Sequence, residues 1–270
     1  MGVSVGAALS AAGHRVFWLP EGRSHATRER AEGAGMRSCG SLEELADTVA
    51  GIVSVCPPAA AEEVASQVRS VGFAGVYVDA NAVSPATARR IGRVIPGAYV
   101  DGGIVGPPAV RPGAARLYLS GPAAEEVAGW FEGSLLDART VAGDAGAASA
   151  LKMCYAAYTK GSSALLLAIR ALAEAEGVDA PLLAEWDISQ PGLADRTQRV
   201  ATGTAAKAWR FVGEMEEIAA TFRDAGLPGG FHDAAGVVYE QLAPLKGNAA
   251  ADLSDVIERL IRARTDARED

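Results

Sequence analysis

The stretch Gly143-Asp-Ala-Gly-Ala-Ala-Ser-Ala-Leu-Lys152-Met-Cys-Tyr155 decides the fold, because the pattern of the chain changes there. Short apolar runs alternate with helical patterns before it, and the chain is almost wholly helical after it. A lysine among alanine, leucine and methionine near the start of a long helix is expected to be buried and to face a cleft or a partner charge. Burial lowers the pKa of an unpaired ammonium, which makes Lys152 a candidate general acid or base. The alternative is a lysine whose stem lies along apolar surface while its ammonium reaches water.

The half of the chain before this stretch reads as alternating strands and helices. Strands are predicted at residues 15–19, 51–56, 75–79, 98–101, 116–120 and 138–142, and helices at 2–13, 26–34, 41–50, 60–71 and 85–95. Short, near-continuous apolar strands that alternate with helices are typical of an α/β fold with a parallel sheet covered on both faces. Residues 1–142 are therefore predicted to form an α/β domain.

Three predicted strands end where a ligand of such a sheet would lie. Open sheets of this kind bind ligands beyond the carboxyl ends of their strands. The segments at these ends are Cys56-Pro57-Pro58, Asp79-Ala80-Asn81 and Asp101-Gly102-Gly103. Proline stops strand pairing by removing an N–H group, and the asparagine side chain offers both donors and acceptors. Ordinary turns between strands and helices are the alternative interpretation.

The second half is predicted to be an all-helical domain over residues 143–270. A long helix is expected from 145 to 177, since its alanines and leucines lie all round it and few residues would break it. Breakers at 177–181, 191–192 and 227–230 separate it from shorter helical patterns at 182–187, 205–225, 231–242 and 253–263. The fold class is thus α/β followed by all-α.

Composition narrows the classes of partner. The 270-residue chain has a net charge of −8 and no persistent basic patch, which argues against nucleic acid and anionic membrane as partners. The three cysteines (Cys39, Cys56 and Cys154) are far apart and lack metal-ligand spacing, so they are expected to be reduced thiols rather than a metal site. No apolar run has the length of a membrane span, and the start shows no signal pattern. We expect a soluble, cytoplasmic protein.

Four segments stand in order along the chain: Met1-Gly2, residues 12–16, residues 101–106 and residues 143–152. They resemble motifs of the β-hydroxyacid dehydrogenase family, which includes 3-hydroxyisobutyrate and 6-phosphogluconate dehydrogenases. Met1-Gly2 is similar to the end of the family's G-x-G-x-M-G, and residues 12–16 are similar to its A-x-G-H-x-V. Residues 101–106 and 143–152 stand where the family has D-x-P-V-S-G and G-x-G-x-x-x-K. The chain looks most like a branch with a C-terminal helical domain of unassigned function.

The resemblance implies a Rossmann-like sheet that lacks its first strand, because the sequence begins at the last glycine of the family's glycine-rich turn. A late start assignment and a chain lacking its first strand are the two interpretations. The resemblance also implies hydride transfer to or from a nicotinamide, with Lys152 moving the hydroxyl proton. By the same resemblance, substrate would lie against Asp101, Gly102, Gly103, Val105 and Gly106, and cofactor against Gly2. The strand ends described above add Cys56, Pro57 and Asn81 as residues expected to bind the cofactor. A small-molecule substrate and a homodimer are also expected.

Departures from the family pattern bear on the substrate. Val105 stands in place of the loop serine, and Pro107 removes a backbone donor. Ala156 replaces the usual asparagine after the lysine, and Glu216 replaces a later lysine. Fewer donors for anions and an added carboxylate favour a less anionic substrate, such as an imine. Tyr155 could then serve as a replacement donor, with packing as the alternative role.

The choice between NAD and NADP is predicted from the residues that follow the segment corresponding to the second strand of the family's fold. Arg23, Ser24 and Arg28 favour NADP, since arginines suit the 2′-phosphate, whereas Glu21 favours the 2′-hydroxyl of NAD. A solvated charged loop is the alternative. We therefore predict an NAD(P)-dependent oxidoreductase acting on CH–OH. An imine reductase on the same fold, or a non-catalytic dimeric scaffold that has lost cofactor binding, are the rival functions.

Overall fold

The computed structural model describes the backbone of residues 1–269 and the side chains up to residue 263. The chain forms two compact units, Met1–Tyr155 and Ala156–Asp270, which divide inside the long helix α7 (Ala147–Ala175). The division comes later than the predicted domain boundary after residue 142. The first two turns of α7 therefore belong to the α/β unit, and Lys152 lies within that unit.

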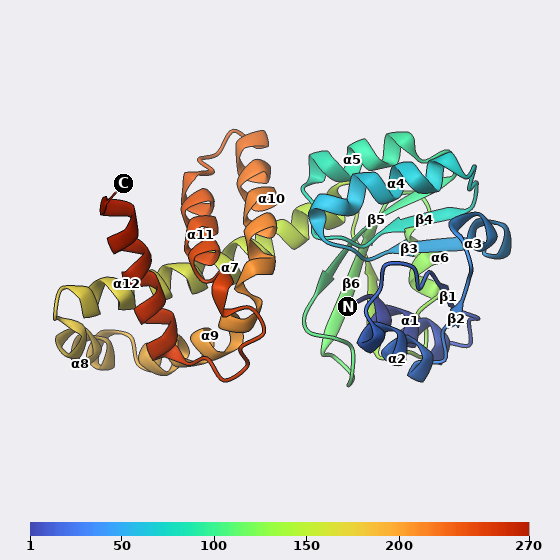
Figure 1. Ribbon diagram of the computed structural model, residues 1–270. Coiled ribbons are helices and arrows are strands. Elements are labelled where there is room, and N and C mark those ends of the chain that lie inside the picture. Colours follow the sequence, from blue (N-terminus) through green and yellow to red (C-terminus); the bar gives the residue numbers. More distant parts are fainter. Residues whose placement is uncertain (270) are drawn as a thin grey trace. The chain divides into compact units, whose positions relative to one another are not determined.

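The α/β unit consists of seven strands and the helices that connect them (Figure 1). Its strands are β1 (Phe17–Trp18), β2 (Arg37–Ser38), β3 (Gly51–Ser54), β4 (Val76–Asp79), β5 (Ala98–Val105), β6 (Ala115–Ser120) and β7 (Leu136–Thr140). Its helices before α7 are α1 (Gly2–Ala11), α2 (His25–Gly33), α3 (Leu42–Thr48), α4 (Ala61–Ser70), α5 (Pro85–Val94) and α6 (Ala124–Gly129), with a 3₁₀ turn at Pro58–Ala60. The predicted fold class is confirmed, although β2 and α6 were not anticipated.

The main sheet has five strands in the order β3-β4-β5-β6-β7, and β1 pairs separately with β2. Strands β3, β4 and β5 are parallel, as expected, but β6 runs antiparallel to β5. The connection between β5 and β6, residues 106–114, contains no helix, and a parallel return would require a helical crossover. Pairing with β6 also extends β5 to Val105, beyond the predicted end at Asp101.

Both faces of this sheet are covered. Alternate residues of β4 point to opposite faces, so Val78 packs in one apolar cluster and Tyr77 in the other. The cluster around Val78 includes residues of α1 and α6, and the cluster around Tyr77 includes residues of α4 and α5. Covering helices on both faces leave the carboxyl ends of β3 and β4 as the open edge of the sheet.

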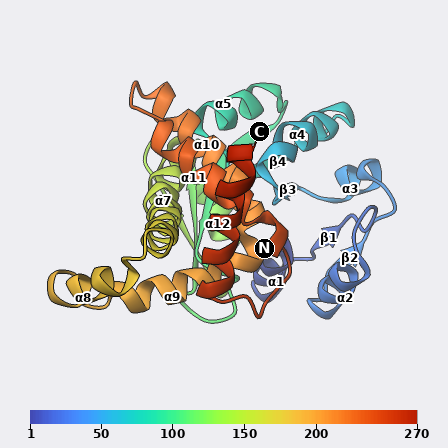
Figure 2. The same cartoon turned by 60° about the vertical axis from the view of Figure 1, so that its left-hand side comes forward.

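The second unit is helical. After α7 come α8 (Asp179–Ser189), α9 (Leu193–Thr204), α10 (Phe211–Asp224), α11 (Gly230–Gln241) and α12 (Leu253–Glu269), with 3₁₀ turns at Ala205–Arg210 and Ala243–Leu245. Helix α10 packs along α11, and α12 contacts both α9 and α11 (Figure 2). Helix α9 was not predicted, and the predicted helix 205–225 begins as a 3₁₀ turn. Among the described residues, no helix is both long and apolar enough to cross a bilayer.

Candidate active site

Asn81 joins the carboxyl ends of β3 and β4. Its Oδ1 accepts a hydrogen bond from the backbone N–H of Cys56 at 2.5 Å. Its Nδ2 donates to Ser54 Oγ at 3.1 Å and to Asp79 Oδ1 at 2.5 Å. The side chain is buried, and both its carbonyl and its amino group have protein partners. The predicted cofactor residue Asn81 therefore shapes the edge of the sheet, where it holds the turn after β4 against the turn after β3.

Cys56 and Pro57 follow β3 at the same edge. The Cys56 thiol is partly buried, and its Sγ lies 3.8 Å from Ser54 Oγ. Burial raises the pKa of the Cys56 thiol, while the positive charge of Arg23 acts in the opposite direction. A raised pKa leaves the thiol protonated near neutral pH, so it is a poor nucleophile.

Arg23, Ser24 and Arg28, which are predicted to bind the 2′-phosphate of NADP, lie at the start of α2. Ser24 caps this helix by accepting a hydrogen bond from Thr27 N at 3.3 Å, and Arg28 donates to the Pro20 carbonyl at 3.3 Å. Arg23, Ser24 and Arg28 are all exposed. An exposed pair of arginines beside a capped helix start leaves their remaining donors open to an anionic group.

Gly2 places the start of α1 next to the end of β3. A Cβ built on Gly2 would lie 3.7 Å from Val55 Cβ, which is ordinary contact. Val55 immediately precedes Cys56, so Gly2 and Cys56 belong to one side of the unit. The structure thus brings together the cofactor residues predicted from three separate segments: Gly2, Arg23 and the pair Cys56-Pro57.

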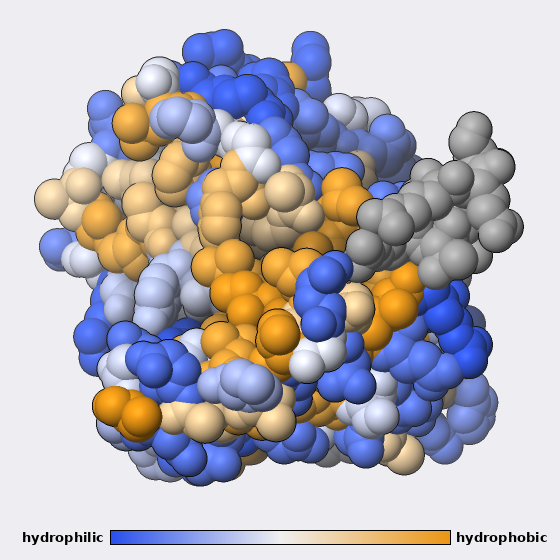
Figure 3. Space-filling view, turned by 90° about the vertical axis from the view of Figure 1, so that its left-hand side faces the viewer, coloured by the Kyte–Doolittle hydropathy of each residue, from blue (hydrophilic) through white to orange (hydrophobic). Residues whose placement is uncertain are grey.

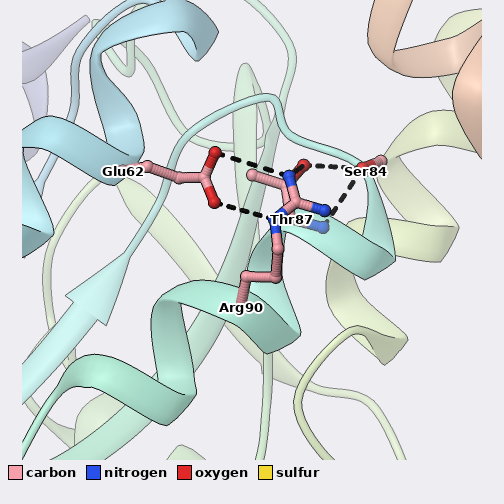
Figure 4. Close-up of polar contacts among 4 residues, drawn as sticks. All are labelled: Glu62, Ser84, Thr87 and Arg90. Carbon is pink, nitrogen blue, oxygen red and sulfur yellow. Dashed lines mark hydrogen bonds and ion pairs between the residues drawn. The ribbon is translucent and has the colours of Figure 1, made fainter.

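A hydrogen-bond network at the start of α5, the helix that follows the Asn81 turn, joins α5 to α4 (Figure 4). Ser84 Oγ caps α5 by accepting a hydrogen bond from Thr87 N at 3.2 Å, and the two hydroxyls lie 2.8 Å apart. Arg90 donates to Thr87 Oγ1 at 2.9 Å and to Glu62 Oε1 on α4 at 2.8 Å. This network ties α4 to α5 and holds the helix that follows the Asn81 turn.

Asp101 lies in the middle of β5 rather than at its end, and its carboxylate is fully buried. Its Oδ2 accepts hydrogen bonds from Gly146 N at 2.8 Å, Ser149 N at 2.9 Å and Ser120 Oγ at 3.1 Å. Its Oδ1 accepts from Ser149 Oγ at 2.5 Å. Ser120 Oγ also accepts from Ala148 N at 3.0 Å. The N–H groups of Gly146, Ala148 and Ser149, at the start of α7, are therefore satisfied by β5 and β6.

Lys152 lies on α7 directly against β5. A Cβ built on Gly103 would lie 2.8 Å from Lys152 Cβ and 3.0 Å from the Ala148 carbonyl oxygen, so glycine allows this approach. Lys152 is only partly buried, so the predicted extent of its burial is wrong. The physical reason is its place at the border of the packed face: Met153 is buried, whereas Tyr155 is exposed.

The remaining predicted substrate residues are distributed along β5. Gly102 packs its backbone near the Asp79 carbonyl oxygen, which a Cβ would approach to 3.0 Å. Val105 is buried and pairs with Arg116 of β6. Gly106 has a φ of +110°, and a Cβ there would lie 2.2 Å from the Ala114 carbonyl oxygen. Asp101, Gly102, Gly103 and Lys152 are thus brought together, while Val105 ends β5 and Gly106 begins the connection to β6.

Sequence reasoning missed Ser120 and Ser149. Each is a fully buried hydroxyl in an otherwise apolar segment, which is the one local signal that could have indicated them. No group of three or more metal-ligating side chains occurs among the described residues.

Comparison with known proteins supports the family resemblance. Residues 173–242 match the model of a family described as a domain of unknown function (DUF1932). No curated protein matches the sequence at a significant level. A solved structure of a conserved protein of unknown function, described as similar to 3-hydroxyacid dehydrogenases, is 26% identical over 90% of this chain and 93% of its own, with a TM-score of 0.67.

Two further solved structures show the same fold. The Mycobacterium tuberculosis 3-hydroxyisobutyrate dehydrogenase with L-serine is 18% identical over 96% of this chain and 95% of its own, with a TM-score of 0.66. The Aspergillus terreus reductive aminase in complex with NADPH4, cyclohexanone and allyl amine is 21% identical over 96% and 95%, with a TM-score of 0.56. These matches show that the chain shares the fold of 3-hydroxyacid dehydrogenase-like proteins, and the match to the domain of unknown function lies within its helical unit.

Proposed function

We propose that the chain is an NAD(P)-dependent oxidoreductase that transfers a hydride between a nicotinamide and a small hydroxy or carbonyl substrate. The observation that carries the proposal is the position of Lys152 on α7 against Gly103 of β5. Gly103 lies two residues beyond Asp101, which pairs with the last residue of β4, Asp79. The stem of Lys152 is thereby held close to the strand ends at which sheets of this class bind ligands.

The residues present at the edge fit a nicotinamide dinucleotide. Arg23 and Arg28 supply positive charge and Ser24 a hydroxyl for a 2′-phosphate, which favours NADP, and Glu21 leaves NAD as the second choice. Gly2 at the start of α1 and the Cys56-Pro57 turn would lie along the rest of the cofactor. When bound, the nicotinamide would accept or deliver the hydride.

Lys152 would hold or release the proton of the substrate oxygen. General acids and bases contribute typically about 10²–10⁴-fold to the rate. Asn81 keeps the β3 and β4 turns together, and α7 carries the ammonium on a rigid element. The side chain of Tyr155, exposed on the same helix, is a further candidate for substrate contact.

One observation favours an imine as the second candidate substrate. The N–H groups of Gly146, Ala148 and Ser149 donate to Asp101 and Ser120, so they are engaged and cannot hold a substrate carboxylate without giving up these bonds. Val105 stands in place of the family's loop serine and therefore supplies no hydroxyl to bind a substrate. Fewer donors for an anion suit a neutral or cationic C=N substrate, and one structural neighbour is a reductive aminase.

The helical unit would form a homodimer. Large apolar side chains are exposed on α7, α8 and α11 and next to them: Leu165, Leu172, Val178, Ile188, Phe231 and Val237. Figure 3 shows apolar side chains gathered on one face of the molecule. Extended apolar surface of this kind marks interaction sites in soluble proteins. The free cysteines would be reduced thiols of a cytoplasmic protein.

The test begins with titration of the purified chain with NADPH and NADH, followed by nicotinamide fluorescence. Micromolar binding with a preference for NADPH is expected. Ketoacids and cyclic imines are then compared as substrates, which separates the two candidate reactions. If neither cofactor binds, the scaffold function is favoured instead.

The role of Lys152 is tested by Lys152→Ala, with Lys207→Ala as the matched control because Lys207 is an exposed lysine of the helical unit. Turnover is expected to fall about 10²–10⁴-fold in Lys152→Ala and to stay unchanged in the control. NADPH affinity should be the same in both. Turnover of Lys152→Ala within about tenfold of the unmodified protein would exclude the proton-transfer role.

A further inference from the structure

We infer that Asp101 is a positioning residue: its buried carboxylate holds the first turn of α7 on β5 and thereby places Lys152. The effect on catalysis rests on the proton-transfer role proposed for Lys152, whereas the positioning does not. Asp101 is 0% exposed. A carboxylate removed from water is costly unless hydrogen bonds compensate it, so its presence in the core requires a specific set of donors.

Those donors come mainly from one helix. Three of the four hydrogen bonds to the Asp101 carboxylate are donated by Ser149 in the first turn of α7 and by Gly146 directly before it: Gly146 N at 2.8 Å, Ser149 N at 2.9 Å and Ser149 Oγ at 2.5 Å. The fourth comes from Ser120 Oγ on β6 at 3.1 Å. The first N–H groups of a helix have no partner within it, and its N-terminus carries partial positive charge. A buried anion is therefore stabilised there, and it draws the helix start onto the sheet.

A second contact, between Gly103 and Lys152, also joins β5 to α7. Asp101 and Gly103 are two residues apart and share one face of β5, while Ser149 and Lys152 are three apart and share one face of α7. Asp101 contacts Ser149, and Gly103 lies so close to Lys152 that a Cβ there would be 2.8 Å from Lys152 Cβ. The two contacts together set both the position of α7 along its axis and its rotation about that axis.

The consequence concerns the ammonium of Lys152. Loss of the Asp101 carboxylate would leave the start of α7 without its acceptors and free to move on β5, and Lys152 would move with it. A displacement of about 1 Å in a catalytic group can cost roughly 10²-fold in rate. Asp101 would thus act through Lys152 and not by touching the substrate.

The experiment reads the position of Lys152 without relying on turnover. The chain has only four lysines: Lys152, Lys160, Lys207 and Lys246. Reductive ¹³C-methylation of the full chain gives one dimethylammonium signal for each, and the Lys152 signal is identified by its loss in Lys152→Arg. Asp101→Ala and Ser149→Ala are expected to move the Lys152 signal and leave the other three in place.

Two further variants sharpen the result. Asp101→Asn keeps one oxygen for the N–H donors and an amino group that can face Ser149 Oγ, so a smaller displacement is expected. Ser41→Ala removes a hydroxyl that caps α3 by accepting from Glu44 N at 3.2 Å, and it should leave Lys152 unchanged. In unlabelled protein, kcat should fall roughly 10²-fold in Asp101→Ala while the Kd for NADPH stays constant.

A Lys152 signal at its original position in folded Asp101→Ala, or in Ser149→Ala should Asp101→Ala not fold, would overturn the positioning role. If the signal moves as expected but the unmodified chain turns over no substrate, the positioning stands and the proposed function fails. If kcat falls while the Lys152 signal is unmoved, Asp101 acts by another route and the inference is wrong.

Discussion

Gly103 and Lys152 lie so close that the strand has no room for a side chain: a Cβ on Gly103 would come to 2.8 Å from Lys152 Cβ. Both atoms are attached to regular backbone, so neither could move without shifting β5 or α7. A glycine in the interior of a strand often marks such a close approach.

Gly103→Ala is therefore expected to lower the free energy of unfolding by about 1–3 kcal/mol, the usual cost of overpacking. Turnover should fall as well, since α7 must move away from β5. Denaturant unfolding and steady-state kinetics measure the two effects. Gly33→Ala in α2 is the matched control, because a Cβ there meets nothing within 4 Å. Equal stability of the two variants would contradict the close packing of α7 on β5.

Arg23 is expected to select the cofactor. Removing its guanidinium in Arg23→Ala should weaken NADPH binding about 10- to 100-fold, the range that corresponds to the roughly 1.5–3 kcal/mol of a hydrogen bond to a charged group. Binding of NADH, which lacks the 2′-phosphate, should change little. Fluorescence titration of both cofactors at low and high salt measures this. Arg111→Ala, an exposed arginine in the 106–114 connection, serves as control; a parallel loss of NADH affinity would argue against phosphate recognition.

His232 is expected to make the stability of the helical unit depend on pH. Its ring is buried against Phe222 and Phe231, with centroid distances of 4.4 Å and 5.2 Å, and a Cβ built on Gly161 of α7 would lie 3.5 Å from its Nδ1. Nδ1 has no hydrogen-bond partner among the described residues. Burial lowers the pKa of His232, and the charge of Asp233 opposes this only partly.

Because the pKa of His232 is lower in the folded state, the unfolded state binds the extra proton first as the pH falls. Stability is then fully present above about pH 6.5, the ordinary pKa of histidine, and is lost below it, by at most about 1.4 kcal/mol for each pH unit. His232→Phe should remove this loss between pH 7.5 and 5, whereas exposed His25→Ala should keep it. Denaturation curves at several pH values measure the slopes. An unchanged slope in His232→Phe would show that another group causes the pH dependence.

Lys160 and Glu214 join α7 to α10 within the helical unit. Lys160 Nζ lies 2.7 Å from Glu214 Oε2, their side chains are 15% and 17% exposed, and Nζ also lies 4.9 Å from the centroid of the Phe211 ring. Lys160→Met or Glu214→Gln alone should cost about 1–3 kcal/mol, since each leaves a partly buried polar group without its partner. The double variant should lose less than the sum. Additive losses in a double-mutant cycle would show that the two groups do not interact.

Local sequence patterns were enough to predict whether most segments form a strand or a helix. The alternation of apolar runs and helical patterns predicted the α/β unit, and the unbroken helical pattern predicted α7 with Lys152 near its start. Helix α9 was missed because it lies between Pro191-Gly192 and a 3₁₀ turn, where the sequence signals a break. Hydrophobic periodicity indicates only which face of a segment is buried. A short helix between helix-breaking residues is too short to show this periodicity clearly.

The same limit applies to the site. Strand ends predicted that Cys56, Asn81 and Asp101 lie at one edge, and the family resemblance singled out Lys152. The length of β5 was mistaken, because pairing with β6 depends on how the chain returns after residue 105 and not on the strand's own residues.

By itself, then, the sequence determined the fold class, the long helix with its lysine, and the chemical character of the sheet edge, since these follow from local periodicity and residue type. Only the tertiary structure decided that Asp101 binds Ser149, that Asn81 binds Cys56 N, and that Gly103 admits Lys152. Each of these contacts joins residues that are distant in the chain. Their formation depends on the packing of whole strands and helices, to which no local pattern responds.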